Sequence, residues 1–215
     1  EEMVDAFESY LSQGMMGIKM KLGHDDPKID IERVTGVRKA LGDDIWISTD
    51  ANQKWDYPTA MMVGRELEQL NVAWFEEPLW CDDSPGHARL ADALDIPIAM
   101  GETLGSRYEF DAYIRADAAD ILQPDICRVG GITEMIKIVH MGQVARKPNA
   151  PHHMMESTIH IACGVMSSGP IEYMPWVSGA FSEPMRIEDG QMFPPQKPGL
   201  GLEIPEDVIQ KYHIE

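Results

Sequence analysis

Three acidic residues, Asp50, Glu76 and Glu102, stand 26 residues apart, and each ends a short apolar stretch. A charge in such a place is unfavourable unless an opposite charge or a metal ion pairs with it. Three carboxylates gathered in one site would repel each other and take up protons, and a divalent cation would remove that repulsion. Oxygen ligands favour Mg²⁺, or Mn²⁺, over Zn²⁺, which prefers histidine and cysteine. The alternative is that all three are solvated loop acids, and spacing alone leaves both open.

Two lysines, Lys19 and Lys21, alternate with Ile18 and Met20 in one apolar stretch. In a β-strand the two lysines share a face, and the apolar residues share the other. Since Ile18 and Met20 suit a face covered by helices, we expect the lysines on the inner face. A lysine in a partly desolvated site beside another cation has a lowered pKa and can act as a base. The alternative is a polar, outward-facing edge.

Asp125, His152 and Glu172 occupy the next three apolar stretches of the chain. A carboxylate behind an imidazole fixes its tautomer and stabilises its charged form, so Asp125 and His152 could form a catalytic pair. A single histidine after a strand is more often structural, and Glu172 could equally be an ordinary acid in a proline-rich turn. These residues become informative only together with the elements that position them.

Short β-forming runs alternate with amphipathic stretches of helical length along the whole chain. The pattern predicts strands over 16–21, 45–50, 73–76, 96–101, 121–124, 150–152 and 171–173. It predicts helices over 5–13, 29–41, 58–70, 83–94, 108–116, 133–146 and 157–166, with Gly42 as a stop signal. Such alternation is typical of βαβ units in an α/β protein with a parallel sheet.

Seven strands in unbroken alternation favour a (β/α) barrel of the TIM type over a doubly wound sheet. No GxGxxG motif follows the first strand, which disfavours dinucleotide binding. A closed barrel usually has eight strands, so we expect one strand upstream of Glu1 and number the predicted strands two to eight. The carboxyl ends of barrel strands meet on one face, where active sites are built. We predict a catalytic barrel over residues 1–176 and a proline- and glycine-rich extension over 177–215 that packs on it.

The chain carries 36 acidic and 18 basic residues, a net charge of −18. This balance argues against nucleic acid and anionic membranes as partners, because phosphate binding relies on lysine and arginine. It does not exclude an anionic substrate, since the local field of a site can oppose the net charge. Cys81, Cys127 and Cys163 form no CxxC pair, so we expect buried, reduced thiols in a cytoplasmic protein.

Taken together, these residues resemble the enolase superfamily and, within it, the mandelate racemase subgroup. The series runs in order along successive strand ends: Lys-x-Lys at 19–21, the three acids, Asp125 with His152, then Glu172, with Pro198-Gly199-Leu200-Gly201 in the tail. The subgroup assignment rests on Asp125 and His152, because relatives similar to muconate cycloisomerase carry a lysine near the sixth strand's end, and residues 123–131 contain none. The resemblance implies a barrel whose first strand and N-terminal capping domain lie outside this chain.

The resemblance also implies a role for each matching residue. Asp50, Glu76 and Glu102 would bind one Mg²⁺ ion, with Mn²⁺ as an alternative, and the substrate carboxylate would coordinate it too. Asn52 would contact the substrate, as the matching asparagine does in relatives.

The remaining roles concern acid–base chemistry. Lys21 would be the base on one face of the substrate α-carbon, with Lys19 assisting at the carboxylate, and His152, held by Asp125, would act on the opposite face. Glu172 would hydrogen-bond the carboxylate oxygen as it becomes an enediolate, for which it must be protonated, a state that burial favours.

These roles leave three functions open. The first is dehydration of a sugar acid, an aldonate or aldarate, to a 2-keto-3-deoxy acid, because Gly101–Arg128 and His152–Glu156 resemble sugar-acid dehydratases. The second is racemisation or epimerisation of a 2-hydroxy acid with the same two bases, and the third is a non-catalytic barrel kept for binding. The resemblance further implies a homo-oligomer.

Overall fold

A computed structural model describes residues 2–165 and 169–213. Its main sheet has five parallel strands in the order of the sequence, so each strand pairs with the next along the chain. The strands are β1 (Gly17–Lys21), β2 (Trp46–Asp50), β3 (Phe75–Glu76), β4 (Ile98–Met100) and β5 (Ile121–Leu122). This arrangement is the parallel α/β sheet that the alternation of elements predicts.

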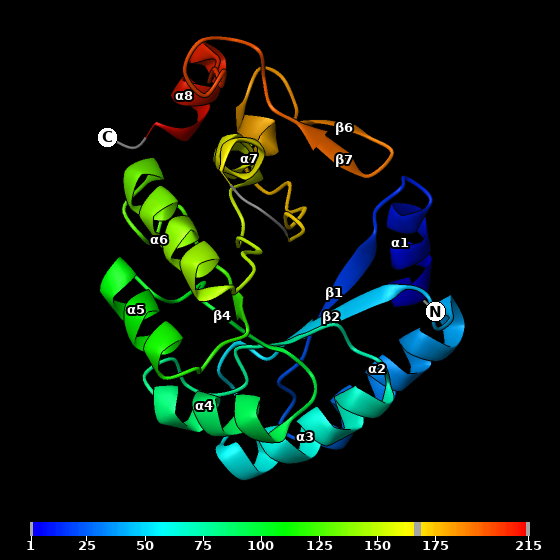
Figure 1. Ribbon diagram of the computed structural model, residues 1–215. Helices are drawn as coiled ribbons and strands as arrows, with labels where there is room; N and C mark the ends of the chain where they lie inside the picture. The colour runs from blue at the N-terminus through cyan, green and yellow to red at the C-terminus, as the bar shows by residue number, and fades with distance from the viewer. Residues whose placement is uncertain (1, 166–168, 214–215) are drawn as a thin grey trace.

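Helices pack around the outside of this curved sheet (Figure 1). They are α1 (Glu2–Leu11), α2 (Pro27–Leu41), α3 (Tyr57–Gln69), α4 (Ser84–Ala93), α5 (Arg107–Arg115), α6 (Ile132–Ala145) and α7 (Met155–Gly164). Side chains of Asp26, Asp56 and Asp83 accept backbone N–H bonds at the starts of α2, α3 and α4, which satisfies donors that a helix leaves free. Gly42 ends α2 at φ 88°, as predicted. The predicted end of the last helix, Met166, lies outside the described residues.

The face of β1 that each residue occupies follows the strand alternation. Ile18 and Met20 are buried in the core between sheet and helices, and Lys19 and Lys21 therefore take the opposite, inner face. The prediction that both lysines point inward is confirmed.

The predicted strands at 150–152 and 171–173 are not formed as strands among the described residues. Residues near the first one follow β5 for a short way: Leu122 bridges to Asn149, and the Ala150 N–H donates to the Leu122 carbonyl at 2.9 Å. Pro148 and Pro151 have no N–H to give to a ladder, and Pro170 precedes the second segment. The first segment thus continues the path of the sheet for a short way without forming a full strand.

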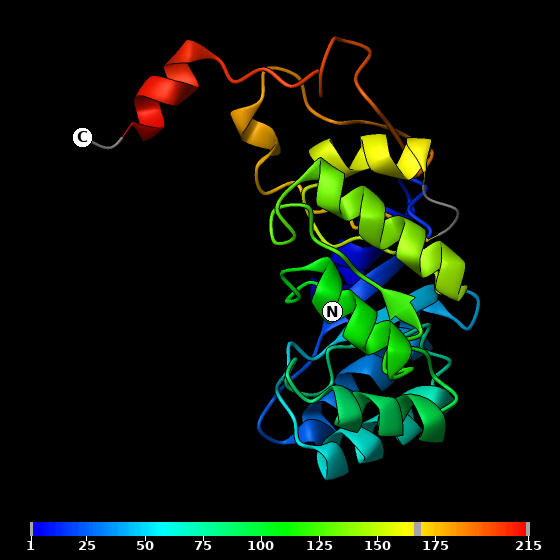
Figure 2. The ribbon, with the colours of Figure 1, turned by 60° about the vertical axis from the view of Figure 1, so that its left-hand side comes forward.

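The C-terminal part of the chain is largely irregular. It contains a 3₁₀ turn (Ser178–Ala180), an antiparallel pair β6 (Arg186–Glu188) and β7 (Gln191–Phe193), and α8 (Glu206–Tyr212), which stands away from the other elements in Figure 2. It contacts α7 through two side chains of that helix. His160 Nε2 lies 2.9 Å from the Leu200 carbonyl, and Glu156 accepts a hydrogen bond from Ser178 Oγ at 2.5 Å.

Two further expectations have a structural outcome. The three cysteines are free, but Cys127 and Cys163 are exposed rather than buried, because Cys127 lies in the loop after β5 and Cys163 on the outer side of α7. In the described part of the chain, the helices are too short or too polar to cross a membrane.

One buried histidine makes stability depend on pH. His87 is fully buried; its Nδ1 lies 2.9 Å from the Asp83 carbonyl, so it carries the hydrogen, and its Nε2 has no hydrogen-bond partner among the described residues. Burial lowers the pKa of His87 below its usual 6.5, so the neutral ring stabilises the fold above pH 6.5, and this contribution is lost as pH falls below that value. We compare the unfolding free energy of the wild type with that of His87→Leu. The wild-type value minus the variant value should decrease as the pH is lowered below 6.5, by at most about 1.4 kcal/mol per pH unit. Urea titrations of both proteins between pH 5 and 8 would measure it, and a flat difference would contradict it.

Candidate active site

The carboxyl ends of β2, β3 and β4 bring three acids together. Asp50 and Glu76 end adjacent strands in register, and Glu102 follows β4 two residues after its end. One oxygen from each of Asp50, Glu76 and Glu102 lies within 4.8 Å of the others, and Asp50 and Glu76 are fully buried. The alternative that these are solvated loop acids is therefore wrong for Asp50 and Glu76.

The electrostatics of these acids suit a divalent cation. Burial raises the pKa of Glu76 to about 7, with the neighbouring Asp50 adding to the shift and Lys19 opposing it. Burial, then the charge of Asp50, also raises the pKa of Glu102. Glu102 Oε2 is buried and accepts no hydrogen bond from the residues that the structure describes, although His152 Nε2 lies 3.3 Å away. An all-carboxylate set with an unsatisfied oxygen and mutual repulsion fits Mg²⁺ or Mn²⁺.

The two lysines of β1 contact these acids. Lys19 Nζ lies 3.0 Å from Glu76, 2.5 Å from Glu172 and 3.9 Å from Asp50. Lys21 pairs with Asp50 and keeps 51% of its side chain exposed. Burial lowers the pKa of Lys19, but the charges of Glu76, Glu172 and Asp50 outweigh it and raise the pKa above its usual value. The expected lowering is thus wrong for Lys19, because three carboxylates surround it in the structure.

His152 and Asp125 form the predicted pair. His152 Nδ1 lies 2.7 Å from Asp125 Oδ2, and the other oxygen of Asp125 accepts N–H bonds from Cys127 and Arg128 at 2.7 and 3.1 Å. Burial opposes ionisation of Asp125, but these hydrogen bonds hold its pKa below the usual range. Burial also lowers the pKa of His152, but the bond to Asp125 and the charges of Glu102 and Glu172 raise it overall. Asp125 therefore orients the imidazole of His152 and stabilises its protonated form.

Glu172 lies between the lysines and the imidazole. Its carboxylate contacts Lys19 Nζ, accepts the His153 N–H at 3.2 Å and lies 4.0 Å from His152 Nε2. Burial raises the pKa of Glu172, but the charge and hydrogen bond of Lys19 lower it below the usual value. The expectation that burial keeps Glu172 protonated is wrong for this arrangement, because its closest partner is a buried cation.

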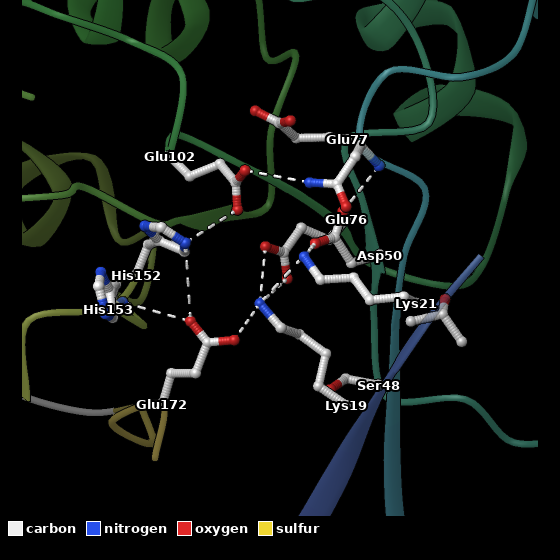
Figure 3. Close-up of polar contacts among 12 residues, drawn as sticks. Lys19, Lys21, Ser48, Asp50, Glu76, Glu77, Glu102, His152, His153 and Glu172 are labelled. Carbon is white, nitrogen blue, oxygen red and sulfur yellow. Dashed lines mark hydrogen bonds and ion pairs between the residues drawn. The ribbon is translucent and has the colours of Figure 1, made fainter. Parts of the chain in front are cut away.

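The site has two opposed sides. In Figure 3 the lysines reach the acids from one side and His152 from the other, with Glu172 between them. Lys19, Lys21 and Glu172 also line a cavity of about 660 Å³, together with Ser48 and Gln123. Among the described residues, the three acids and His152 do not line this cavity, whose wall is formed largely by the starts of β1 and β2 and by residues 170–176. A ligand held at the acids would thus have an amine and an imidazole on opposite faces.

Asn52 and three residues that the sequence did not single out complete the surroundings. Asn52 Nδ2 donates to Glu102 Oε1 at 3.1 Å, and its N–H donates to Asp50 at 2.9 Å. Behind the acids, the Glu77 carboxylate accepts from Thr103 Oγ1 at 2.6 Å and from Gln53 Nε2 at 3.1 Å. The adjacent acids in Glu76-Glu77-Pro78 were the signal available for Glu77, since neighbouring residues at a strand end point to opposite sides.

Comparisons with known proteins agree with this geometry. Residues 2–208 match the family described as enolase C-terminal domain-like. L-talarate/galactarate dehydratase of Salmonella typhimurium is 42% identical over 193 residues, which cover 90% of this chain and 48% of that protein. Arabinonate dehydratase of Saccharolobus solfataricus is 35% identical, over 99% of this chain and 59% of the relative.

A solved structure is equally similar. The crystal structure of L-talarate dehydratase from Polaromonas sp. JS666, complexed with Mg and L-glucarate, superposes with a TM-score of 0.93 at 42% identity, over 97% of this chain and 58% of that one. The chain thus spans about half to three-fifths of the length of these relatives. The resemblance to the enolase superfamily seen in the strand-end residues is confirmed.

Proposed function

This chain belongs to the enolase C-terminal domain-like family, and we propose that it is the catalytic barrel of an enzyme that removes the proton next to a substrate carboxylate and so dehydrates a sugar acid. The observation that carries the proposal is the placement of Lys21 and His152 on opposite sides of the acid cluster. The names of the two curated relatives, both sugar-acid dehydratases, support an aldonate or aldarate as substrate.

Asp50, Glu76 and Glu102 would hold the Mg²⁺ ion. When bound, the ion supplies positive charge that stabilises the negative charge developing on the substrate carboxylate. The α-proton of a carboxylate is far less acidic than any side-chain base, so this stabilisation is what makes proton removal feasible. Lys19, with its buried ammonium beside Glu172, adds a second positive charge at the carboxylate.

The chain's own residues then move the protons. Lys21, in its neutral form, takes the α-proton from one face. On the other face, protonated His152 gives its proton to the β-hydroxyl, the β C–O bond breaks, and water leaves. The resulting enol takes up a proton at the β-carbon and loses its hydroxyl proton at the α-carbon, and so becomes the 2-keto-3-deoxy acid. For substrates of opposite configuration at the α-carbon, His152 would be the base and Lys21 the acid.

Glu172 and Asn52 would position the substrate. The charge of Lys19 outweighs burial and lowers the pKa of Glu172, so we propose that Glu172 holds the Lys19 ammonium against the substrate carboxylate and becomes a donor only if it takes up a proton when the substrate binds. Asn52, which donates to Glu102, would keep that carboxylate oriented and offer its amide to a substrate hydroxyl.

The larger organisation belongs to the same proposal. Residues 1–176 would form the barrel, residues 177–215 an extension held against it through Glu156 and His160, and the enzyme would act as a cytoplasmic homo-oligomer.

A screen of mono- and diacid sugars with the full-length protein and Mg²⁺ tests the proposed reaction. We expect at least one acid to give a product that reacts with semicarbazide, which detects a 2-keto acid. Deuterium exchange from D₂O at the α-carbon, without keto acid, would instead identify a racemase or epimerase. No turnover and no metal binding would favour a non-catalytic barrel.

A further inference from the structure

Glu77 is a fully buried carboxylate that takes no part in the acid cluster. It follows Glu76 directly, and its side chain leads away from the cluster in Figure 3. Both of its oxygens are satisfied: Oε1 accepts from Thr103 Oγ1 at 2.6 Å, and Oε2 accepts from Gln53 Nε2 at 3.1 Å. Gln53 Nε2 also donates to Thr103 Oγ1 at 2.8 Å, which closes the three side chains into a ring of hydrogen bonds.

Each member of this ring comes from a different loop: two of the loops directly follow a strand that ends in an acid of the cluster, and the third contains Glu102. Gln53 follows Asp50 after β2, Glu77 follows Glu76 after β3, and Thr103 follows Glu102 after β4. The loops are further joined where the Gln53 N–H donates to the Glu77 carbonyl at 2.8 Å and the Cys81 N–H donates to Gln53 Oε1 at 2.9 Å. The ring therefore ties together the three segments that position the acids.

The backbone supports the same interpretation. Gln53 and Glu77 adopt φ values of 64° and 40°, a left-handed conformation that is unfavourable for residues other than glycine. Since each side chain has hydrogen-bond partners on the other loops, the ring holds a conformation that the local sequence would not choose.

We propose that Glu77 is a positioning residue of the metal centre and acts through its hydrogen bonds with Gln53 and Thr103. It would set the directions of the three acids, Asp50, Glu76 and Glu102, without touching the ion. This inference rests on the proposed function, because it requires the three acids to bind a metal. Residues that orient metal ligands typically change metal affinity about 10–100-fold when altered.

Four variants of the full-length protein separate this role from a general effect on folding. Thr103→Val removes the hydroxyl with little change of shape, and Thr103→Ser restores it. Glu77→Gln replaces one acceptor oxygen by an N–H₂ donor, so either Gln53 Nε2 or Thr103 Oγ1 loses its acceptor, and the oxygen of Gln53 already accepts from Cys81. Asp30→Asn is the matched control: Asp30 is also a fully buried acid that orders a loop, accepting N–H bonds from Gly23 and His24 at 2.7 Å, but its loop carries none of the three acids.

Titration with Mn²⁺ alone, followed by calorimetry, is the test, with thermal unfolding measured on the same samples. We expect Thr103→Val and Glu77→Gln to bind Mn²⁺ about 10–100-fold more weakly, Thr103→Ser to bind like the wild type, and Asp30→Asn to lose stability but not affinity. If Glu77→Gln does not fold, Thr103→Val and its serine rescue decide the question.

Three outcomes would overturn the inference. Equal affinity in Thr103→Val and the wild type would show that the ring has no influence on the site, and a loss in Asp30→Asn that matches the others would show a general folding effect. A wild type that binds no Mn²⁺ would overturn the proposed function as well, whereas the first two outcomes leave that function standing.

Discussion

Alanine in place of Lys21 should lower kcat for the sugar acid that the screen identifies by about 10²–10⁴-fold, the usual contribution of a general base. The same loss is expected for His152→Asn, which keeps the size of the side chain but cannot exchange a proton near neutral pH. Because the two groups face opposite sides of the bound acid, each variant should keep deuterium exchange for the substrate isomer whose α-hydrogen faces the remaining base. Mass spectrometry of substrate incubated in D₂O would measure this.

Lys39→Ala is a matched control for that experiment. Lys39 lies in the last turn of α2 and is exposed on the outer surface, so its removal should leave kcat and exchange unchanged. Normal turnover in both Lys21→Ala and His152→Asn would show that the two bases are wrongly assigned. Loss of exchange for both isomers in either variant would show that the two groups do not act on separate faces.

The acid cluster was predictable because the carboxyl ends of neighbouring parallel strands must lie side by side. Asp50 and Glu76 are in register across β2 and β3, and an equal spacing in sequence reflects one βα unit per step. The inward direction of Lys19 and Lys21 followed from strand alternation with Ile18 and Met20. These predictions need only local geometry and a repeated topology.

Protonation states were not predictable in the same way. Glu172 was expected to be neutral from burial alone, but its state depends on Lys19, which comes from a strand more than 150 residues earlier in the chain. The strand predictions at 150–152 and 171–173 failed for a related reason, because Pro151 and Pro170 cannot donate to a ladder, and only the first segment bridges to the sheet, next to it at Asn149. Both outcomes depend on which partners the tertiary structure supplies.

Binding of Mg²⁺ should stabilise the folded protein measurably. A ligand that binds only the folded state adds about 2.7 kcal/mol at a concentration of 100 times its Kd. Here it would also offset the burial, and the smaller repulsion by Asp50, that raise the pKa of Glu76 and Glu102. We expect the melting temperature to rise with Mg²⁺ and to return to its initial value when a chelator is added in excess. Scanning calorimetry across a Mg²⁺ titration would measure both changes.

Glu76→Gln should abolish that rise, because it removes a buried charged ligand and leaves an amide, a weaker ligand for a hard cation. The loss of affinity should exceed the 10–100-fold typical of residues that only orient ligands. Glu134→Gln is the control, since Glu134 pairs with Arg107 and Lys137 outside the site and its removal leaves the cluster unchanged. An equal rise in melting temperature for Glu76→Gln and Glu134→Gln would mean that Mg²⁺ stabilises the protein at some other place, and the acid cluster would then lose its role as the metal centre.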